Sequence, residues 1–147
     1  MNTAIIAAAG KGTRFNSGRP KQFLEILGKP IDAADARRML RLLSGRDHQV
    51  ITGVCLIADG KLLVASETTL VSMIEISDRE IADYIATGEP MDKAGAYAIQ
   101  GIASRWIPRI EGDYSNVVGL PVALVWRLLR DNRIGVDSLS PKNEMSS

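Results

Sequence analysis

Apolar residues recur at helical spacing between Asp32 and Ser44. The spacing i, i+3, i+4, i+7 places one apolar stripe on this stretch, formed by Ala36, Met39, Leu40 and Leu43. Asp32 is of a type that caps helix N-termini, and Gly45 stands where glycine commonly ends a helix. Arginines occupy the other face, which we interpret as a solvated surface rather than a binding patch. The pattern predicts an amphipathic helix over residues 32–44.

Two further helices are predicted from the signals at their ends. Ser77 followed by Glu80 forms a capping box, and the helix that it opens runs to Gly88, a stop signal. Pro121 stands at the opening of the last apolar repeat, where a helix tolerates proline in its first turn. The buried stripe expected for this last helix consists of Val122, Val125, Leu128 and Leu129.

Four stretches have the apolar pattern of β-strands: residues 3–9, 49–57, 62–76 and 102–110. Residues 49–57 are apolar on both alternating faces, so we expect them to form a central strand. The dipeptide Asp59-Gly60 between the second and third stretches is typical of a two-residue hairpin turn. After the fourth stretch, residues 111–116 predict a polar turn.

Strands and helices thus alternate along the chain without an internal repeat or a linker. This organisation predicts an α/β fold with a mixed, twisted sheet flanked by helices, in a single domain over residues 1–131. From residue 132 to residue 147 polar residues replace apolar ones, and we expect a flexible tail there.

The composition narrows the classes of function. Lys and Arg number 18 and Asp and Glu 17, a balance that argues against a nucleic-acid or membrane-surface partner. The chain has one cysteine, Cys55, and one histidine, His48, so we expect no intramolecular disulfide and no multi-cysteine zinc site. The first apolar run is short and lacks a basic start, so we expect no signal peptide, no membrane span and a cytoplasmic protein. We expect His48, Cys55 and both tryptophans, Trp106 and Trp126, to have structural roles.

Candidate chemistry is concentrated in residues 88–101, called the glycine segment below. Gly88, Gly95 and Gly101 allow a tight backbone path past a ligand. Lys93 supplies a charge suited to phosphate, and Gln100 offers both a donor and an acceptor. The segment is longer than an ordinary connection, which is typical of a site. A solvated glycine-rich loop is the alternative that this pattern leaves open.

A second candidate follows the first predicted strand. Gly10-Lys11-Gly12-Thr13-Arg14 combines two glycines with two cations, and the backbone N–H groups of such a turn can bind an anion. The spacing matches neither a Walker loop nor a dinucleotide fingerprint, because Phe15 occupies the place of the third glycine. Spacing alone is therefore a weak signal here.

Residues 27–131 closely resemble the Maf family. The resemblance is carried by several uncommon sequence motifs that occur in the same order as in the family, namely Gly28-Lys29-Pro30, residues 32–37, residues 48–54, residues 92–101 and residues 111–121. It implies a Maf-like architecture, similar to anticodon-binding and inosine triphosphatase-like folds. It also implies a nucleoside triphosphate pyrophosphatase, which splits the α–β phosphoanhydride into nucleoside monophosphate and pyrophosphate with a divalent cation, expected to be Mg²⁺.

The resemblance further implies a substrate and a set of site residues. The words around Asp92-Lys93 and Ile99-Gln100-Gly101 resemble the branch that acts on dTTP and UTP. Lys29, Lys93 and Gln100 fall on the family's substrate-contacting positions, and we take them as the candidate catalytic residues. A homodimer is also implied.

The start of the chain departs from the Maf pattern. The family's Ser-Pro-Arg-Arg-type loop is absent, and so is its Ala-Asp-Thr strand end, whose aspartate would serve as base or metal ligand. Residues 1–31 resemble instead the nucleotide-binding start of methylerythritol-phosphate cytidylyltransferase. That resemblance assigns phosphate binding to Gly10, Lys11, Gly12, Arg14 and Lys21.

The two resemblances meet at residues 27–30, a word that both families share. We interpret the chain as a chimera in which residues 1–30 supply a strand and phosphate loop, and residues 31–131 supply the Maf-like body. A strand of a parallel sheet that ends in an anion-binding loop can replace another strand of this kind. The alternative is a divergent Maf homologue with an unrelated start.

Three functions follow, in order of expectation. The first is a nucleotide pyrophosphatase, impaired by the missing aspartate, since the remaining acidic candidates occupy positions typical of caps and turns: Glu25, Asp32, Asp92 and Asp113. The second is a catalytically silent nucleotide-binding scaffold. Cytidylyl transfer ranks last, because the half of that family that binds the acceptor is missing.

Overall fold

The computed structural model describes residues 4–8 and 27–135. Its sheet contains β1 (Ala4–Ala8), β2 (Asp47–Ala58), β3 (Lys61–Ser72) and β4 (Arg109–Glu111), which lie side by side in this order. The α-helices are α1 (Ala33–Leu43), α2 (Asp78–Ala86), α3 (Tyr114–Val118) and α4 (Val122–Asp131). Short 3-10 helices connect the second half of the chain, namely η2 (Glu89–Asp92), η3 (Ala94–Ala96) and η4 (Ile102–Trp106). The predicted α/β fold with a sheet flanked by helices is confirmed, but the described strands all pair antiparallel, so the expectation of a mixed sheet is wrong.

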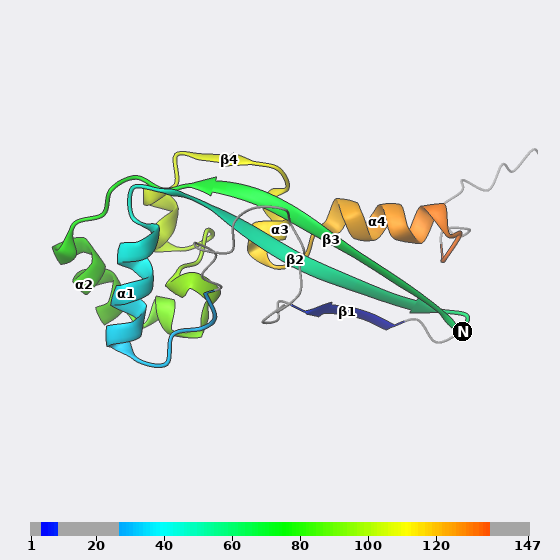
Figure 1. The fold of residues 1–147 in the computed structure, drawn as a ribbon, viewed down its shortest axis with the longest axis horizontal. Helices are drawn as coiled ribbons and strands as arrows, with labels where there is room; N and C mark the ends of the chain where they lie inside the picture. The colour runs from blue at the N-terminus through cyan, green and yellow to red at the C-terminus, as the bar shows by residue number, and fades with distance from the viewer. Residues whose placement is uncertain (1–3, 9–26, 136–147) are drawn as a thin grey trace, which may run out of the picture.

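The hairpin of β2 and β3 runs along the length of the molecule (Figure 1). The two strands pair residue for residue from Asp47 with Ser72 to Ala58 with Lys61. Asp59 and Gly60 both have positive φ, 49° and 75°, as a two-residue hairpin turn of type I′ requires. β2 is flanked by β1 and β3, so the prediction of a central strand is confirmed.

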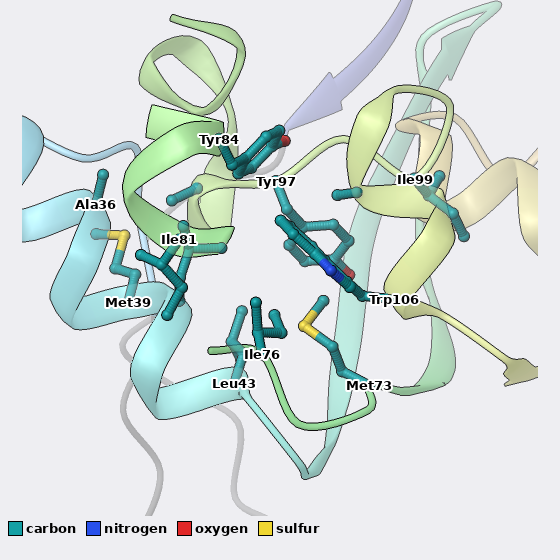
Figure 2. Packing of buried hydrophobic residues seen from close by; sticks show 13 residues of the cluster. Ala36, Met39, Leu43, Met73, Ile76, Ile81, Tyr84, Tyr97, Ile99 and Trp106 are labelled. Carbon is teal, nitrogen blue, oxygen red and sulfur yellow. The ribbon is translucent and has the colours of Figure 1, made fainter. Parts of the chain in front are cut away.

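The main hydrophobic cluster lies at one end of the hairpin, where α1 and α2 gather (Figure 1). Figure 2 shows its side chains converging from α1, α2, the glycine segment and η4. Trp106 and Tyr84 are 1% exposed and meet edge to face at 5.2 Å. Full burial of each large apolar side chain stabilises the fold by about 1.5–3 kcal/mol. The predicted stripe of the first helix is buried as expected, and so is Trp106.

α4 covers the other half of the hairpin on one face of the sheet (Figure 1). Leu124 and Val125 pack there on Val54 of β2. The prediction of Val122 in the buried stripe is wrong: Val122 is the first helical residue and is 56% exposed. Trp126 is 42% exposed on the same helix, so it lacks the packing role expected for it. None of the helices in the described part of the chain is both long and apolar enough to cross a bilayer.

The opposite face of the hairpin is apolar and open. Ile57 and Leu62 stand opposite each other across β2 and β3, and Val64 stands opposite Cys55 in the same face. The exposed fractions are 41% for Ile57, 63% for Leu62 and 73% for Val64. Contiguous exposed apolar side chains of this kind mark contact surfaces in soluble proteins.

The second half of the chain departs most from prediction. Residues 102–110 form η4 followed by only three residues of strand, because the amide of Ile102 bonds to the carboxylate of Glu89 and not to a neighbouring strand. The predicted turn over residues 111–116 contains the start of α3, capped by Asp113. The strand predicted over residues 62–76 ends at Ser72, since the next amide, that of Met73, donates to the carbonyl of Arg46.

The direction of the first strand also differs from expectation. A place in a parallel sheet was expected for it, but β1 pairs antiparallel with β2, with Ala4 opposite Ile57 and Ala8 opposite Gly53. In an antiparallel pair, the C-terminal ends of the two strands lie at opposite ends of the sheet. The comparison with parallel phosphate-binding sheets therefore does not hold for this strand.

Candidate functional site

Part of the glycine segment, around residues 96–99, packs into the main hydrophobic cluster. η2 and η3 form its first half, and Pro90, Gly95, Ala96, Tyr97 and Ile99 are buried. Asp92 and Gln100 are exposed, and the Lys93 side chain is 43% exposed. The segment is therefore neither a pure ligand-binding loop nor a pure solvated loop. Its buried residues anchor it in the hydrophobic cluster, and this anchor holds Asp92, Lys93 and Gln100 at the surface.

Lys29 and Lys93 lie around one carboxylate. The Lys93 Nζ donates to both oxygens of Asp92, at 2.8 and 3.0 Å. This hydrogen bond lowers the pKa of Asp92, and the positive charges of Lys93 and Lys29 lower it further. The two segments are joined by their backbones as well, since the amide of Gly95 donates to the carbonyl of Gly28 at 3.1 Å. The structure thus brings together two of the three residues predicted as catalytic.

Gln100 lies in the turn after the buried part of the segment. The amide of Gly101 closes this turn on the carbonyl of Ala98 at 3.1 Å. Across the described ranges, no hydrogen bond or ion pair joins Gln100 to Lys29 or Lys93. Membership of Gln100 in the same site as the lysines therefore stays a prediction.

Glu89 is a residue that sequence reasoning missed. Its Oε1 accepts from the Tyr84 hydroxyl at 2.8 Å and from the Ile102 amide at 3.0 Å. The Tyr84 hydroxyl in turn accepts from the Ala98 amide at 3.3 Å. The carboxylate therefore ties α2 to the turn that carries Gln100. A glutamate that directly follows the helix-stopping Gly88 gives no sign of this role in sequence.

The glycines of the segment have different uses. Gly88 ends α2 in the left-handed region with φ 78°. Gly95 also has positive φ, 71°, and the residue after it, Ala96, has φ 60° although it is not glycine and is fully buried. Such a conformation costs a non-glycine residue about 1–2 kcal/mol. Contacts around this turn must hold it in place.

His48 and Tyr97 supply one such contact. The His48 Nε2 and the Tyr97 hydroxyl are 2.7 Å apart, and the rings meet edge to face. Burial lowers the pKa of His48, although the nearby charge of Asp47 acts in the opposite direction. Burial also raises the pKa of Tyr97, so the phenol keeps its proton.

Several predicted site residues lie outside the described part of the chain. These are the phosphate-binding candidates Gly10, Lys11, Gly12, Arg14 and Lys21, and the acidic candidate Glu25. Of the other acidic candidates, Asp32 caps α1 by accepting from the Asp35 amide at 2.8 Å. Asp113 caps α3 by accepting from the Ser115 amide at 2.7 Å. Both act as the caps that the sequence indicated.

The described carboxylates do not fit a bound divalent cation. Within residues 4–8 and 27–135, no group of three or more His, Cys, Asp or Glu side chains is arranged for a metal. Both oxygens of Asp92 are held by a lysine, and the Glu89 carboxylate is bonded to Tyr84 and Ile102. A cation would have to displace these donors.

An open groove of about 330 Å³ lies beside the segment, and neither candidate lysine lines it. Its walls come from η4, β4 and the start of α3, and Ile99, next to Gln100, contributes to one wall. Arg109 in this groove is paired with Glu111 at 2.6 Å. The groove adds no convergent charge to the lysine cluster.

The model of the Maf-like protein family matches residues 19–132. The chain belongs to this family. The match begins within the segment that was compared above to a cytidylyltransferase, so part of residues 19–31 fits the Maf pattern as well.

Three individual relatives are dTTP/UTP pyrophosphatases. The chain is 63% identical over 111 residues to the dTTP/UTP pyrophosphatase of Koribacter versatilis, a match that covers 76% of this chain and 56% of that protein. It is 52% identical over 115 residues to the dTTP/UTP pyrophosphatase of Thermococcus gammatolerans, covering 78% of this chain and 60% of that protein. A third, from Chromobacterium violaceum, is 59% identical over 98 residues, 67% of this chain and 50% of that protein. The chain therefore spans between half and three-fifths of these relatives.

Proposed function

We propose that this chain acts on nucleoside triphosphates as a pyrophosphatase of the dTTP/UTP type. The observation that carries the proposal is its 63% identity over 111 residues to a protein described as a dTTP/UTP pyrophosphatase. The cluster of Lys29 and Lys93 supports it, because phosphoryl transfer depends on cations that neutralise the charge of the phosphates.

The proposed reaction is hydrolysis at the α-phosphorus. Water attacks that atom, the bond to the oxygen that bridges the α- and β-phosphates breaks, and pyrophosphate leaves while the nucleoside monophosphate keeps the attacking oxygen. The water's proton passes to solvent or to the leaving pyrophosphate. Lys93 exchanges its Asp92 partner for the polyphosphate, and Lys29 adds a second positive charge. Gln100 offers a donor and an acceptor to the base or the phosphate.

A catalytically silent nucleotide-binding scaffold is the second candidate. It is favoured by the acidic side chains, since Asp32 and Asp113 are engaged as caps and Asp92 is engaged by Lys93. Loss of a general base costs about 10²–10⁴-fold in rate. The proposed activity is accordingly an impaired one.

We propose that residues 1–30 are a cytidylyltransferase-like graft whose Gly10, Lys11, Gly12, Arg14 and Lys21 add phosphate contacts within one domain over residues 1–131. Cytidylyl transfer itself ranks last.

Mg²⁺ is proposed to arrive bound to the nucleotide, which suits an ion that keeps its waters and takes phosphate ligands. The cytoplasm is the proposed compartment, and a homodimer is supported by the open apolar face at Ile57, Leu62 and Val64.

One experiment separates these functions. The purified chain is incubated with dTTP, UTP, CTP and GTP, each with and without Mg²⁺, and products are separated by ion-exchange chromatography. Monophosphate and pyrophosphate from dTTP and UTP are the expected result. Calorimetric binding of dTTP without turnover would establish the scaffold instead. Absence of both binding and turnover for all four nucleotides would refute the proposal, and sedimentation of the same sample tests the dimer.

A further inference from the structure

The hydrogen bond between His48 and Tyr97 joins the start of β2 to the end of the glycine segment. The two residues are 49 positions apart in sequence, and the His48 Nε2 lies 2.7 Å from the Tyr97 hydroxyl. The ring centroids are 5.4 Å apart at an interplanar angle of 87°. His48 is the one histidine of the chain, and the reaction proposed above does not use it.

The bond lies in an environment where loss of a partner is costly. Tyr97 is 8% exposed and projects into the cluster shown in Figure 2. In the described part of the chain, the His48 Nδ1 is buried without a hydrogen-bond partner, so Nε2 is the ring atom through which His48 is held. A buried polar atom left unpaired costs about 1–3 kcal/mol. Removal of either side chain would therefore leave the other with an unmet donor or acceptor.

The bond anchors a strained turn that carries the lysine cluster. Gly95 and Ala96 have φ of 71° and 60°, and Tyr97 follows them directly in extended conformation. On the other side of the turn, the Ala96 amide donates to the Lys93 carbonyl at 3.1 Å, and the Gly95 amide donates to the Gly28 carbonyl at 3.1 Å. The turn therefore fixes Lys93 relative to Gly28, the neighbour of Lys29.

We propose that His48 is a positioning residue for the triphosphate site: its bond to Tyr97 holds the Gly95–Ala96 turn and so keeps Lys93 beside Lys29. This inference rests on the proposed function, in which the two lysines bind the polyphosphate. Left-handed alanine relaxes when its surroundings no longer fix it. Without the bond, the turn opens toward solvent and the two lysine ammonium groups separate.

The test compares His48→Phe, Tyr97→Phe and His48→Gln with the parent chain. Phenylalanine keeps an aromatic ring at either position and removes the hydrogen bond, whereas glutamine at position 48 keeps a side chain that can bond to the Tyr97 hydroxyl. The first readout is the KM and kcat for dTTP, or the Kd where turnover is absent. Both phenylalanine variants are expected to raise the KM or Kd about tenfold, a loss of about 1.4 kcal/mol of binding, with a smaller change in kcat. His48→Gln is expected to restore most of the affinity.

The second readout does not depend on nucleotide. Hydrogen exchange of the Gly95 and Ala96 amides is measured by mass spectrometry on the folded fraction, and both phenylalanine variants are expected to exchange faster. Tyr84→Phe is the matched control, because it removes a different buried hydroxyl, bonded to Glu89 and Ala98, from the same cluster. It is expected to leave the Gly95 amide protected.

The two readouts separate the possible failures. If the parent chain binds no dTTP, the proposed function fails, and exchange at Gly95 still decides whether His48 holds the turn. Unchanged exchange in both phenylalanine variants overturns the proposal. So does faster exchange with unchanged dTTP affinity, because the bond would then be structural only.

Discussion

Gly101 lies against the carboxylate of Glu89 so closely that a Cβ at position 101 would come within 2.6 Å of Glu89 Oε2 and nearer still to Oε1. The carboxylate occupies this space because it also bonds to the Ile102 amide at 3.0 Å and the Tyr84 hydroxyl at 2.8 Å. Glycine is therefore required at position 101 because the Glu89 carboxylate fills the space that a side chain would occupy. The sequence-based explanation, a close approach to a ligand, is not needed for this glycine.

Gly101→Ala is expected to displace the Glu89 carboxylate from its two partners. A hydrogen bond to a charged group contributes about 1.5–3 kcal/mol, so the free energy of unfolding should fall by about 2–3 kcal/mol in urea denaturation. The control is the same substitution in a Glu89→Ala background, where no carboxylate is left to collide with the new methyl group. There the cost should drop below about 1 kcal/mol. Equal costs in both backgrounds would show that the clash is not with Glu89.

Local signals account for the elements that the sequence predicted well. Ser77 and Glu80 bond reciprocally at the start of α2, with Glu80 Oε2 accepting from the Ser77 amide at 2.9 Å. Asp59 and Gly60 both adopt left-handed conformations, which aspartate tolerates better than most residues and which glycine adopts freely because it has no Cβ. In such cases the residues that determine the structure are three or fewer positions apart, so the pattern is visible in a short window.

Elements that depend on distant partners were missed. Residues 102–110 have the apolar composition of a strand, but the Ile102 amide is taken by Glu89, thirteen positions away in the chain. Asn116 looked like a residue of a polar turn, yet it is 0% exposed and bonds to both strands of the hairpin. For the site, the resemblance indicated Lys29 and Lys93, but the proximity of Lys29 to Asp92, far away in the chain, follows from the fold. Nothing local in the sequence distinguishes these long-range contacts.

Asn116 supports a prediction about stability. Its Nδ2 lies 3.0 Å from the Val50 carbonyl, 3.3 Å from the Glu67 carbonyl and 3.0 Å from the Thr69 hydroxyl. Asn116→Ala should lower the free energy of unfolding by about 2–3 kcal/mol, because buried acceptors lose their donor. Asn116→Asp should be worse at pH 7, since a buried carboxylate would then face two carbonyl oxygens.

Urea denaturation of both variants at pH 7 and pH 4.5 checks this order. Protonation of the new carboxyl at low pH should bring Asn116→Asp toward Asn116→Ala. Thr69→Val serves as the control that removes one partner of Asn116 and leaves the amide itself in place. An aspartate variant as stable as the parent at pH 7 would contradict the arrangement.

His48 makes the stability depend on pH in one direction. Burial lowers its pKa below the ordinary 6.5, with the charge of Asp47 opposing part of this shift. As the pH falls below 6.5, the unfolded chain therefore binds a proton that the folded chain resists, and the free energy of unfolding decreases. The carboxyl groups with lowered pKa, those of Asp35, Glu80 and Asp92, titrate at more acidic pH and do not contribute in this window.

The measurement is the urea midpoint between pH 7.5 and pH 5.5. The midpoint of the parent chain should fall over this interval, and that of His48→Gln should stay nearly constant, because no other histidine is present in the chain. Parallel curves for the two proteins would show that His48 is not the group responsible.

The pair of Asp92 and Lys93 leads to a prediction about affinity. The Lys93 Nζ is held by both oxygens of Asp92, at 2.8 and 3.0 Å, so a triphosphate must compete with this carboxylate for the lysine. Asp92→Asn removes the competing charge and also the repulsion between Asp92 and the phosphates. Its Kd for dTTP, measured by calorimetry at low salt, should fall about three- to tenfold, while Lys93→Ala should raise it by about tenfold or more.

Both effects should shrink as NaCl is raised to 0.5 M, since the lysine is half exposed and its charge is screened. Asp78→Asn is the matched control, because it neutralises an equally exposed aspartate that pairs with Arg41 on α1. Weaker binding in Asp92→Asn would mean that the carboxylate itself contributes to holding the nucleotide, and the role of competitor would have to be abandoned.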